Sequence, residues 1–491
     1  MDKSNQIMKK TSGKRTLTIV LFAYIVLTIC FYFLGGEQLH LRRTDTGNMV
    51  TPTDNVGEIL SDTVLRQQFS IDADTLTDVS VFTSCFEREN GCTLHLAVCR
   101  ADDELGAVDI PASELGDAEV TSVHFPDKIH IVPGEVLELC VSSPDAFPGN
   151  AVSLYYGSSI SVTKGSVRKQ LSSSDLLQCN SQRVEGILVF QVSGTKTLLF
   201  GRIYFMLAAV LGLLLAAAGA TLLYKRQKGL SSPILRLFDA FQRYRFLLEQ
   251  MVNRDFKAKY KRSVLGIFWS FLNPLLMMSV QYVVFSTLFQ SNIPNFPLYL
   301  LSGIVLFNFF NESTNMCLMS IVNNVNLITK VYVPKYIYPV TKLISSSINL
   351  FLSLIPLFLV MLLTHAPIRA QSILFLFCVV CLEALSLGFG MMLASMMVFF
   401  RDTQFIWSVL IMILNFATPI FYPETIIPAR FMTVYRMNPL YPIVGFARTV
   451  LLEGISPEPM MYLYCLLAGL IPLAFGLWVF KKTQDSFVQN F

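Results

Sequence analysis

Asn253–Pro274, NRDFKAKYKRSVLGIFWSFLNP, is the stretch that decides the fold of this 491-residue chain. Residues 254–262 are strongly cationic, which suits the headgroup layer on the cytoplasmic side of a membrane. From Val264 onward the stretch is apolar enough to enter a bilayer. Gly266 lies between these halves, where a glycine permits a tight backbone turn. The stretch therefore predicts the point at which a set of membrane spans begins, with an added module before it.

The composition excludes an ordinary soluble protein, because 53% of the residues are hydrophobic and only 15% are charged. The apolar residues fall into eight runs, each long enough to cross a hydrocarbon core of about 30 Å as a helix. Residues 36–198 hold 23 acidic and 11 basic side chains, a balance of −12, whereas the rest of the chain holds 11 acidic and 27 basic, a balance of +16. This asymmetry predicts that the two parts lie on opposite sides of a membrane. Nucleic acid is not an expected partner, because the basic residues flank apolar spans.

The first 35 residues predict a membrane anchor whose N-terminus is cytoplasmic. Residues 1–16 carry five basic side chains and one acid, and residues 17–35 follow as an apolar run. A cleaved signal peptide is the alternative, but the run is long for one and no small-x-small cleavage site follows it. A lipid-attachment box at Leu27–Cys30 is a poor match because Ile29 is too large. We therefore expect an uncleaved anchor.

Residues 36–198 predict an all-β extracytoplasmic domain inserted between two spans. Short alternating runs separated by turn signals are typical of a two-sheet antiparallel sandwich, and its final strand leads into the next span. The runs are Val79–Phe82, Thr93–Cys99, Val120–Phe125, Val136–Val141, Val152–Tyr156 and Ile187–Val192. Disulfide pairing stays open among the five cysteines, Cys85, Cys92, Cys99, Cys140 and Cys179. Cys85 and Cys92 could face each other across a hairpin at Asn90-Gly91.

The remainder predicts a mainly α-helical polytopic membrane protein with eight transmembrane helices in all. Residues 199–224 form the second span, and residues 225–262 form an amphipathic helix, too charged to span, along the cytoplasmic interface. Residues 263–480 form six core spans, and residues 481–491 are a cytoplasmic tail. The six are Val264–Phe289, Pro297–Val322, Pro339–Leu363, Ile373–Phe400, Phe405–Phe421 and Met460–Phe480. Basic residues in alternate loops place both termini in the cytoplasm.

The segment Pro423–Glu458 differs from the other loops because it is long, semi-apolar and rich in proline and aromatic residues. Two short helices dipping into the outer leaflet would explain it, provided that protein covers their backbone. Arg430, Arg436 and Arg448 argue against placing this segment on the outer side.

Familiar catalytic and metal-binding patterns are missing from the sequence. It has no G-x-x-x-x-G-K-[ST] phosphate loop, no H-E-x-x-H and no G-x-S-x-G, so we expect no catalytic site and no metal site. Cys378 and Cys381 form a lone C-x-x-C inside a span, where helix packing explains them better than metal binding. Asp72-Ala73-Asp74 has the spacing of a sugar-nucleotide transferase motif, but a solvated loop is the simpler interpretation.

Several separate motifs in residues 253–491 carry a resemblance to a known family. They are Arg254-Asp255 with Lys257, Tyr260, Ser263, Leu265, Gly266 and Trp269, then Asn273-Pro274, Asn326–Lys330 with Pro334 and Pro339, Phe400–Asp402, Pro419–Tyr422 and Asn438–Leu440. This half of the chain resembles the membrane subunit of a type 2 ATP-binding-cassette exporter of lipid-linked polysaccharides such as O-antigen, teichoic acid and capsule precursors. Residues 1–230 depart from that family's short cytoplasmic start.

The resemblance implies roles for these motifs. Docking to a separate ATPase is implied for a coupling helix that includes Asn326, Leu327, Ile328, Lys330, Pro334, Lys335 and Pro339. The inner mouth of a channel is implied for Arg254, Asp255, Tyr260, Ser263, Leu265, Gly266 and Trp269. An outer gate is implied for Pro419, Asn438 and Pro439. Arg254 and Asp255 could instead pair with each other or cap the interfacial helix.

A sugar polymer presents hydroxyl edges and C–H faces, and aromatic rings accept those faces without holding one sugar tightly. Candidates for lining such a channel are Phe268, Phe271, Tyr282, Phe285, Phe405, Trp407, Phe416, Phe421 and Tyr422. Packing against lipid or neighbouring helices is the alternative for most of them. Glu312 and Glu383 lie inside spans, at a cost of about 2.5–3.5 kcal/mol each at a helix centre, so an interhelical hydrogen bond is expected rather than proton coupling.

The resemblance also implies partners. Two copies of this chain would form a homodimer in the cytoplasmic membrane, and two ATPase subunits would bind ATP and Mg²⁺, with no cofactor in this chain. The cargo would be a polyprenyl-linked polysaccharide, and the β domain, with Tyr155 and Tyr156 as candidates, could bind the glycan. Alternatives are an exporter of drugs or lipids with the same fold, and a membrane-anchored sensor or cell-wall assembly protein.

Overall fold

The computed structural model describes residues 2–48, 52–101, 103–157, 177–180, 182–184, 186–228, 233–261, 266–287, 293, 295–330 and 333–489. The chain divides into two compact units. The β unit spans Leu39–Arg202, joined by Pro428–Arg430, and the helical unit comprises the rest. Each unit has a hydrophobic core of its own.

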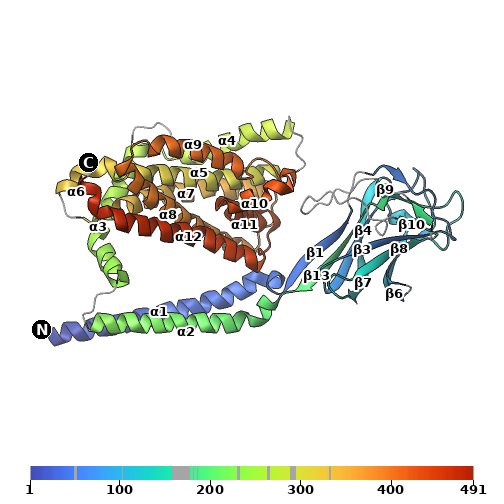
Figure 1. The fold of residues 1–491 in the computed structure, drawn as a ribbon, viewed down its shortest axis with the longest axis horizontal. Coiled ribbons are helices and arrows are strands. Elements are labelled where there is room, and N and C mark those ends of the chain that lie inside the picture. The colour runs from blue at the N-terminus through green and yellow to red at the C-terminus, as the bar shows by residue number, and fades with distance from the viewer. Residues whose placement is uncertain are drawn as a thin grey trace. The chain divides into compact units, whose positions relative to one another are not determined.

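Two antiparallel sheets make up the β unit, as the alternating runs predicted (Figure 1). The first sheet has the order β1-β13-β4-β9-β12, with β2 on β9 and β7 on β4, and the second has the order β11-β10-β3-β8-β5-β6. The strands are β1 (Leu41–Asn48), β2 (Asp54–Asn55), β3 (Val64–Ser70), β4 (Thr75–Ser84), β5 (Thr93–Arg100), β6 (Asp103–Pro111), β7 (Glu119–His130), β8 (Val136–Ser142), β9 (Ser153–Gly157), β10 (Leu177–Cys179), β11 (Gln182–Val184), β12 (Ile187–Leu188) and β13 (Phe190–Thr197).

The core between the sheets follows from the two-residue period of the strands, which sends alternate side chains to one face. Leu65, Val79, Leu96 and Val192 are fully buried in it. The first and last strands pair with each other, with Leu41 opposite Thr197. Because the first and last strands of the inserted segment pair with each other in one sheet, the β unit is a self-contained insertion.

The expected hairpin at Asn90-Gly91 is wrong. β4 and β5 flank that turn but belong to different sheets, so the connection crosses the sandwich. Cys85 and Cys92 are both buried as free thiols. Burial also raises the pKa of the free Cys140 thiol to about 12. The pairing that the sequence left open is therefore absent, as Cys99 and Cys179 are free as well.

In the helical unit, α1 (Asp2–Gly35) and α2 (Leu199–Gln227) lie side by side (Figure 1). The Tyr24 hydroxyl donates to the Ala208 carbonyl at 2.7 Å, and the Tyr204 hydroxyl donates to the Thr28 carbonyl at 2.8 Å. These bonds satisfy two phenols inside an apolar pair of helices, where an unpaired hydroxyl would be costly. In the sequence, α1 leads into β1 and β13 leads into α2, and these two strands pair with each other.

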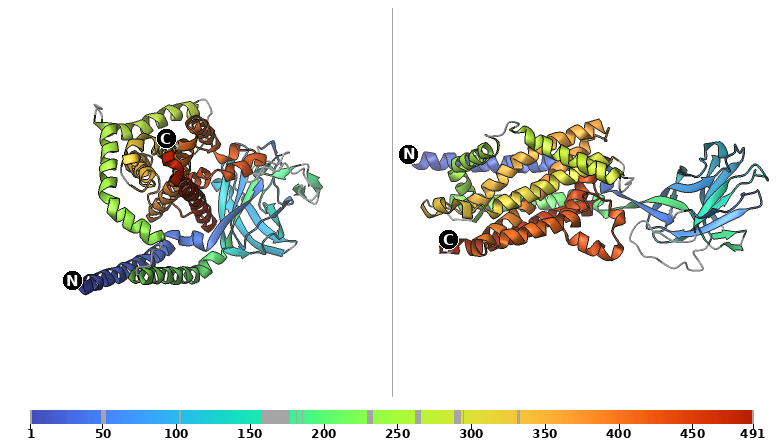
Figure 2. Two further views of the ribbon diagram at one scale, coloured as in Figure 1. Left: turned by 60° about the vertical axis from the view of Figure 1, so that its left-hand side comes forward. Right: turned by 90° about the horizontal axis from the view of Figure 1, so that it is seen from above.

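The turn predicted at Gly266 is confirmed. α3 (Pro233–Tyr260) and α4 (Phe268–Thr287) lead into it from either side, and Figure 2 shows that they run in different directions. Gly266 has φ of +52°, in the left-handed region that only glycine enters without strain. The amphipathic helix predicted between residues 225 and 262 is α3, which is continuous to Tyr260.

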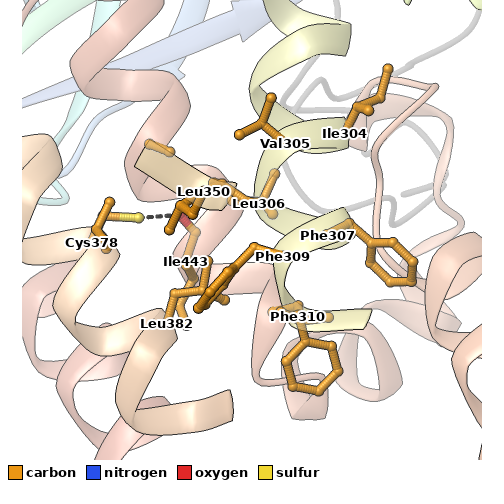
Figure 3. Close-up of a cluster of buried hydrophobic side chains, with 14 of the residues drawn as sticks. Ile304, Val305, Leu306, Phe307, Phe309, Phe310, Leu350, Cys378, Leu382 and Ile443 are labelled. Atoms are coloured by element: carbon orange, nitrogen blue, oxygen red, sulfur yellow. Dashed lines mark hydrogen bonds between the residues drawn. The ribbon is translucent and has the colours of Figure 1, made fainter. Parts of the chain in front are cut away.

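The core of the helical unit consists of α5 (Phe296–Leu318), α7 (Ile337–Leu363), α8 (Phe375–Phe399) and α12 (Pro459–Thr483). Figure 3 shows its centre, where Phe309 and Leu382 lie among buried aliphatic side chains. The Cys378 thiol bonds to the Ile443 carbonyl at 3.2 Å, which supports the packing interpretation of the C-x-x-C. α8 and α12 touch through glycines, since a Cβ on Gly476 would lie 2.0 Å from the Gly388 carbonyl oxygen.

Short elements complete the chain. They are η1 (Gly36–Leu39), η2 (Ala112–Glu114), η3 (Val322–Asn324), α6 (Val325–Lys330), η4 (Ala370–Leu374), α9 (Thr403–Ala417), η5 (Glu424–Ile426), α10 (Ala429–Met437), α11 (Leu440–Arg448), the π-helical η6 (Thr449–Glu453) and η7 (Gln484–Gln489). α10 and α11 are the two short helices predicted in residues 423–458. We define the loop end of the bundle as residues 318–337, 399–403 and 483–489, and the opposite end as residues 295–299, 363–375 and 417–459.

Six helices of the described chain are long and apolar enough to cross a membrane. They are Leu17–Leu39, Leu199–Gln227, Phe268–Ser286, Ile337–Leu363, Ala370–Phe399 and Pro459–Gln489. The other two expected spans are helical, but α5 is not among the six and α9 is short, with 15 residues. The helical membrane region is therefore confirmed, while the number of eight spans remains a prediction.

Candidate functional site

The C-terminal turns of α3 are attached to the bundle by a nearly buried ion pair. The Lys342 ammonium of α7 lies 2.7 Å from Asp255 Oδ2, and the two side chains are only 15% and 11% exposed. Arg254, which is 53% exposed, lies 3.2 Å from the other carboxylate oxygen. The pairing expected between Arg254 and Asp255 is therefore present, but Lys342 is the closer and more buried partner of Asp255.

A second polar cluster lies further along α3 and links it to three other helices. The Lys259 ammonium donates to Glu312 Oε1 of α5 at 2.6 Å, and Asn349 Nδ2 of α7 donates to the same oxygen at 2.6 Å. The Tyr260 hydroxyl donates to Asn349 Oδ1 at 2.8 Å and also bonds to the Ser270 hydroxyl of α4. The interhelical hydrogen bond expected of Glu312 is confirmed. Glu383 is half-buried on α8.

We call these seven residues the α3 network: Asp255, Lys259, Tyr260, Ser270, Glu312, Lys342 and Asn349. Together they connect α3, α4, α5 and α7 through charges and amides. Moving α3 away from the bundle would separate two ion pairs, and Lys342, only 15% exposed on α7, would lose its carboxylate partner, which is unfavourable. The network can therefore hold α3 in one position and transmit its displacement to α5 and α7. Ser263 and Leu265, which the sequence placed with this site, lie outside the described residues.

The segment Asn326–Pro339, which the resemblance predicts as the coupling helix and which we call the coupling loop, includes most of the short helix α6 at the loop end of the bundle. Asn326, Thr329 and Lys330 are exposed on this short helix, whereas Ile328 is 9% exposed and packs into a core with Tyr338. Leu327 is half-buried against the same core. The exposed surface of α6 is thus polar and basic, and its apolar side chains stabilise the loop itself.

Lys335 and the two prolines of this loop are engaged within the chain. The Lys335 ammonium donates to the Gln484 carbonyl and lies 5.7 Å from the ring centroid of Phe487. Phe487 is fully buried, so the tail folds back on the loop. Pro334 is half-buried and Pro339 is buried. Among the described residues of this loop, Lys330 is the basic residue that stays exposed, because Lys335 is committed to η7.

The aromatic channel candidates separate into two groups by burial. Exposed members lie on α4 and α9: Phe268, Trp269, Tyr282, Phe405 and Phe416. Trp407 and Phe421 are 3% and 8% exposed, with Trp407 packed between Phe310 and Phe389. Phe271, Phe285 and Tyr422 are half-buried, and Phe285 stacks on Phe421 with ring centroids 5.6 Å apart. A single chain thus presents rings outward from α4 and α9, which flank the bundle.

A cavity of about 460 Å³ at the opposite end is lined by Tyr282, Ser286, Ile293, Asn295, Phe296, Pro297 and Thr364.

The opposite end of the bundle is organised by Arg448, which is 8% exposed. Its guanidinium donates to the carbonyls of Pro419 at 2.6 Å and of Ile420 at 3.0 Å, and it lies 3.4 Å from the ring centroid of Tyr299. Its five donors, spread over a planar fork, can satisfy carbonyls at several positions, whereas the three donors of a lysine ammonium all lie on one nitrogen. Protein therefore encloses the charge of Arg448, so this residue does not count against an outer placement of residues 423–458.

Asn438 and Pro439 join the same region. Asn438 Oδ1 accepts the Leu440 amide at 3.0 Å, and Asn438 Nδ2 donates to the Thr418 hydroxyl at 2.8 Å. Pro439 precedes the first residue of α11, where its fixed φ suits a helix start. The structure thus brings the three residues predicted as an outer gate, Pro419, Asn438 and Pro439, into one hydrogen-bonded corner.

Sequence reasoning missed several residues that matter to this arrangement. Lys342, Asn349 and Phe487 had no motif of their own, since each acts by meeting a residue far away in the chain. A signal existed for Lys342 and Asn349, because a lysine and an asparagine in an otherwise apolar span need polar partners. No comparable signal marks Phe487, which is one of 39 phenylalanines.

Comparisons with known proteins match the C-terminal half, the part that contains the α3 network and the coupling loop. The ABC-2 type transporter family model matches residues 247–452. The O-antigen export system permease protein RfbA of Myxococcus xanthus is 32% identical over 264 residues, which cover 52% of this chain and 100% of that protein. RfbA of Klebsiella pneumoniae is 29% identical over 50% of this chain and 94% of its own length. The polysialic acid transport protein KpsM of Escherichia coli is 22% identical over 51% and 98%.

The matched region runs from the middle of α3 to the π-helical η6 and leaves the β unit outside. The resemblance predicted from the motifs is therefore confirmed. A relative that is 32% identical along its whole length settles the membership. The chain belongs to the ABC-2 type transporter family, as a non-catalytic permease subunit whose ATPase is a separate subunit.

Proposed function

We propose that this permease translocates a lipid-linked polysaccharide across the cytoplasmic membrane, driven by a separate ATPase. The observation that supports this most is the likeness to permeases named for O-antigen export and polysialic acid transport, over nearly the full length of each. The exposed rings on α4 and α9 supply surfaces suited to sugar C–H faces. O-antigen-like, teichoic acid-like and capsule-like polymers share that chemistry.

The orientation that goes with this function places both termini and the coupling loop in the cytoplasm and the β unit outside. Two observations favour it. Basic residues gather at the end of α2 and at the loop end of α12, as the positive-inside rule requires. The β unit, whose segment is strongly acidic, is inserted between α1 and α2, so both connections to it leave on one side of the membrane.

The working assembly is a two-fold dimer with two ATPase subunits. In this assembly α6 docks on the ATPase through the exposed Asn326, Thr329 and Lys330, while Ile328 and Lys335 keep the loop rigid from within. The α3 network transmits the motion, because α3 and α6 share a packed core through Met251 and Ile328. The exposed rings Phe268, Trp269 and Phe405 face the conduit or the second copy.

A deletion and complementation experiment tests the function. Cells lacking this gene should accumulate the lipid-linked polymer inside and lose it from the surface, and the wild-type chain should restore surface display, read by lectin or antibody staining. The variant Lys330→Glu should fail to restore display although it is expressed at the wild-type level. If polymer display is unchanged in the deletion strain while drug or lipid efflux is lost, the cargo assignment is wrong and the exporter of small molecules is correct.

The β unit extends the proposal, because it has no counterpart in the matched relatives. A glycan-binding role on the outer side of the membrane fits an inserted β-sandwich. Of the two tyrosines predicted as candidates, Tyr156 packs against the core of the sandwich and is held there by its neighbours, so it is not a free platform. Tyr155 lies on the other side of its strand.

A further inference from the structure

The first sheet of the β unit carries a row of four residues, Gly47, Gln191, Ser80 and Ser122, across four adjacent strands, in which Ser122 is exposed, Gln191 half-buried and Ser80 buried. Gly47 of β1 lies opposite Gln191 of β13, Gln191 lies opposite Ser80 of β4, and Ser80 lies opposite Ser122 of β7. The neighbours of Gln191 along its strand, Phe190 and Val192, point into the core. Because side chains alternate along a strand, this row faces away from the core.

Gly47 leaves the sheet surface beside Gln191 without a protruding side chain. Its φ is +138°, and a Cβ built there would lie 2.2 Å from the Phe190 carbonyl oxygen. β1 therefore contributes backbone and no side chain next to Gln191. The Ser80 and Ser122 hydroxyls bond to each other at 2.8 Å, and the exposed Ser122 retains further capacity to donate or accept. The amide of Gln191 has both a donor and an acceptor to offer.

Aromatic side chains border one edge of the row. Phe82 lies two residues after Ser80 on β4, opposite Val120, which is 46% exposed. The ring of Tyr155, from β9, meets the Phe82 ring edge to face with centroids 5.0 Å apart. Both rings are half-buried, so part of each is accessible for contact. Inclined at 75° to each other, the two rings form an apolar border.

Charged side chains border the other edge. His124 Nδ1 lies 2.9 Å from Asp78 Oδ1, and Arg43 lies 3.3 Å from Asp78 Oδ2. The His124 and Arg43 side chains are 71% and 66% exposed, whereas Asp78 is 27% exposed. Asp78 is thus oriented by its two neighbours, and all three retain hydrogen-bonding capacity toward a ligand.

We infer that this face is a glycan-binding platform for the exported polysaccharide, with sugar rings stacked on Tyr155 and Phe82 and hydroxyls bonded to Gln191, Ser122 and Asp78. The inference rests on the proposed function. A pyranose has an apolar C–H face and a rim of hydroxyls, and the platform offers aromatic rings, a row of donors and acceptors, and charged groups in that order along β4. A non-polar protein partner would not match the charged edge.

The test measures binding of full-length chain in lipid nanodiscs to polysaccharide isolated from the envelope of the producing cells, immobilised on a biosensor. Wild-type protein should bind, and Tyr155→Ala should raise the dissociation constant at least about fivefold, as expected for loss of an aromatic contact. Gln191→Ala should raise the dissociation constant to a similar extent. Phe147→Ala is the matched control, because Phe147 is an aromatic residue, 60% exposed, in a loop outside the platform. It should bind as wild type does.

Surface display of the polymer, scored in parallel in cells, separates the two proposals. If the wild-type chain supports display but does not bind the polysaccharide, or if Tyr155→Ala and Gln191→Ala bind as well as wild type, the platform is wrong and the exporter stands. If display does not depend on the chain at all, the proposed function fails. Because circular dichroism of each variant reports the β fold, loss of binding with an unchanged spectrum and melting temperature supports the platform.

Discussion

The ion pair between Asp255 and Lys342 carries the sharpest prediction for the helical unit. The charged atoms are 2.7 Å apart and the side chains are 11% and 15% exposed, so removing one partner strands the other in a poorly solvated place. Breaking such a pair costs about 3–5 kcal/mol, whereas replacing both partners by apolar residues costs much less. Asp255→Ala should therefore lower the apparent melting temperature of the purified chain by about 6–10 °C.

A double-mutant cycle isolates the pair. Asp255→Ala, Lys342→Met and the double variant should give a coupling energy of about 2 kcal/mol or more, because the double variant relieves the stranded charge. Lys342→Met should cost less than Asp255→Ala, since Arg254 still neutralises Asp255.

The matched control for this cycle is the pair formed by Arg245 and Glu249 on the same helix, which are 75% and 54% exposed at 2.8 Å. It should show a coupling energy of at most about 0.5 kcal/mol. Thermal unfolding in nanodiscs, followed by fluorescence-detected size exclusion, measures both cycles. Equal coupling in the two pairs would refute the claim that α3 is held by buried electrostatics.

Four further outcomes follow from single sites. Lys330→Glu should abolish stimulation of the partner ATPase at unchanged expression. The control is Arg369→Glu, which changes an exposed basic residue at the opposite end of the bundle and should leave the stimulation intact. An equal loss of stimulation in both variants would contradict docking through α6. Arg448→Lys should cost about 2–3 kcal/mol, seen as a drop in melting temperature, because lysine cannot reach the same set of carbonyls. Tyr338→Phe should leave stability unchanged or raise it, since the Tyr338 hydroxyl is buried without a partner among the described residues. The backbone amide of Cys85 donates to Asp117 and holds the pKa of its carboxyl below the usual 3.8. The ionised Asp117 therefore stabilises the β unit above pH 3.8, and this stabilisation is lost as the pH falls through the lower pKa of the folded state. Asp117→Asn should flatten the fall of the β-unit melting temperature below about pH 4.

Periodicity and turn chemistry allowed most of the secondary structure to be predicted from the sequence. Every expected strand run overlaps a strand of the sandwich, and the glycine turn at Gly266 and the two short helices before α12 were placed correctly. These features depend on residues near one another in the chain. The Asn90-Gly91 hairpin failed because a turn signal does not say whether the flanking strands join one sheet or two.

Long-range pairings were not predictable from patterns. Arg448 looked like a misplaced charge until the structure brought it to Pro419 and Tyr299, and Lys335 looked free until the tail folded onto it. Glu312 was the exception, because the cost of an acid inside a span demands a polar partner even when the partner is unknown. Patterns also did not show which aromatic channel candidates are buried, since the burial of Trp407 depends on α5 and α8.

Reconstitution of the permease with its ATPase in inside-out vesicles tests the central claim most directly. The measurement is protection of lipid-linked polysaccharide, supplied on the outside of the vesicles, from a glycan-degrading enzyme after ATP is added. Protection should require ATP and both subunits, and Lys330→Glu should remove it. Protection of the polysaccharide without ATP or without the ATPase would contradict the account. So would a lack of protection with ATP and both subunits present, if the vesicles carry another cargo.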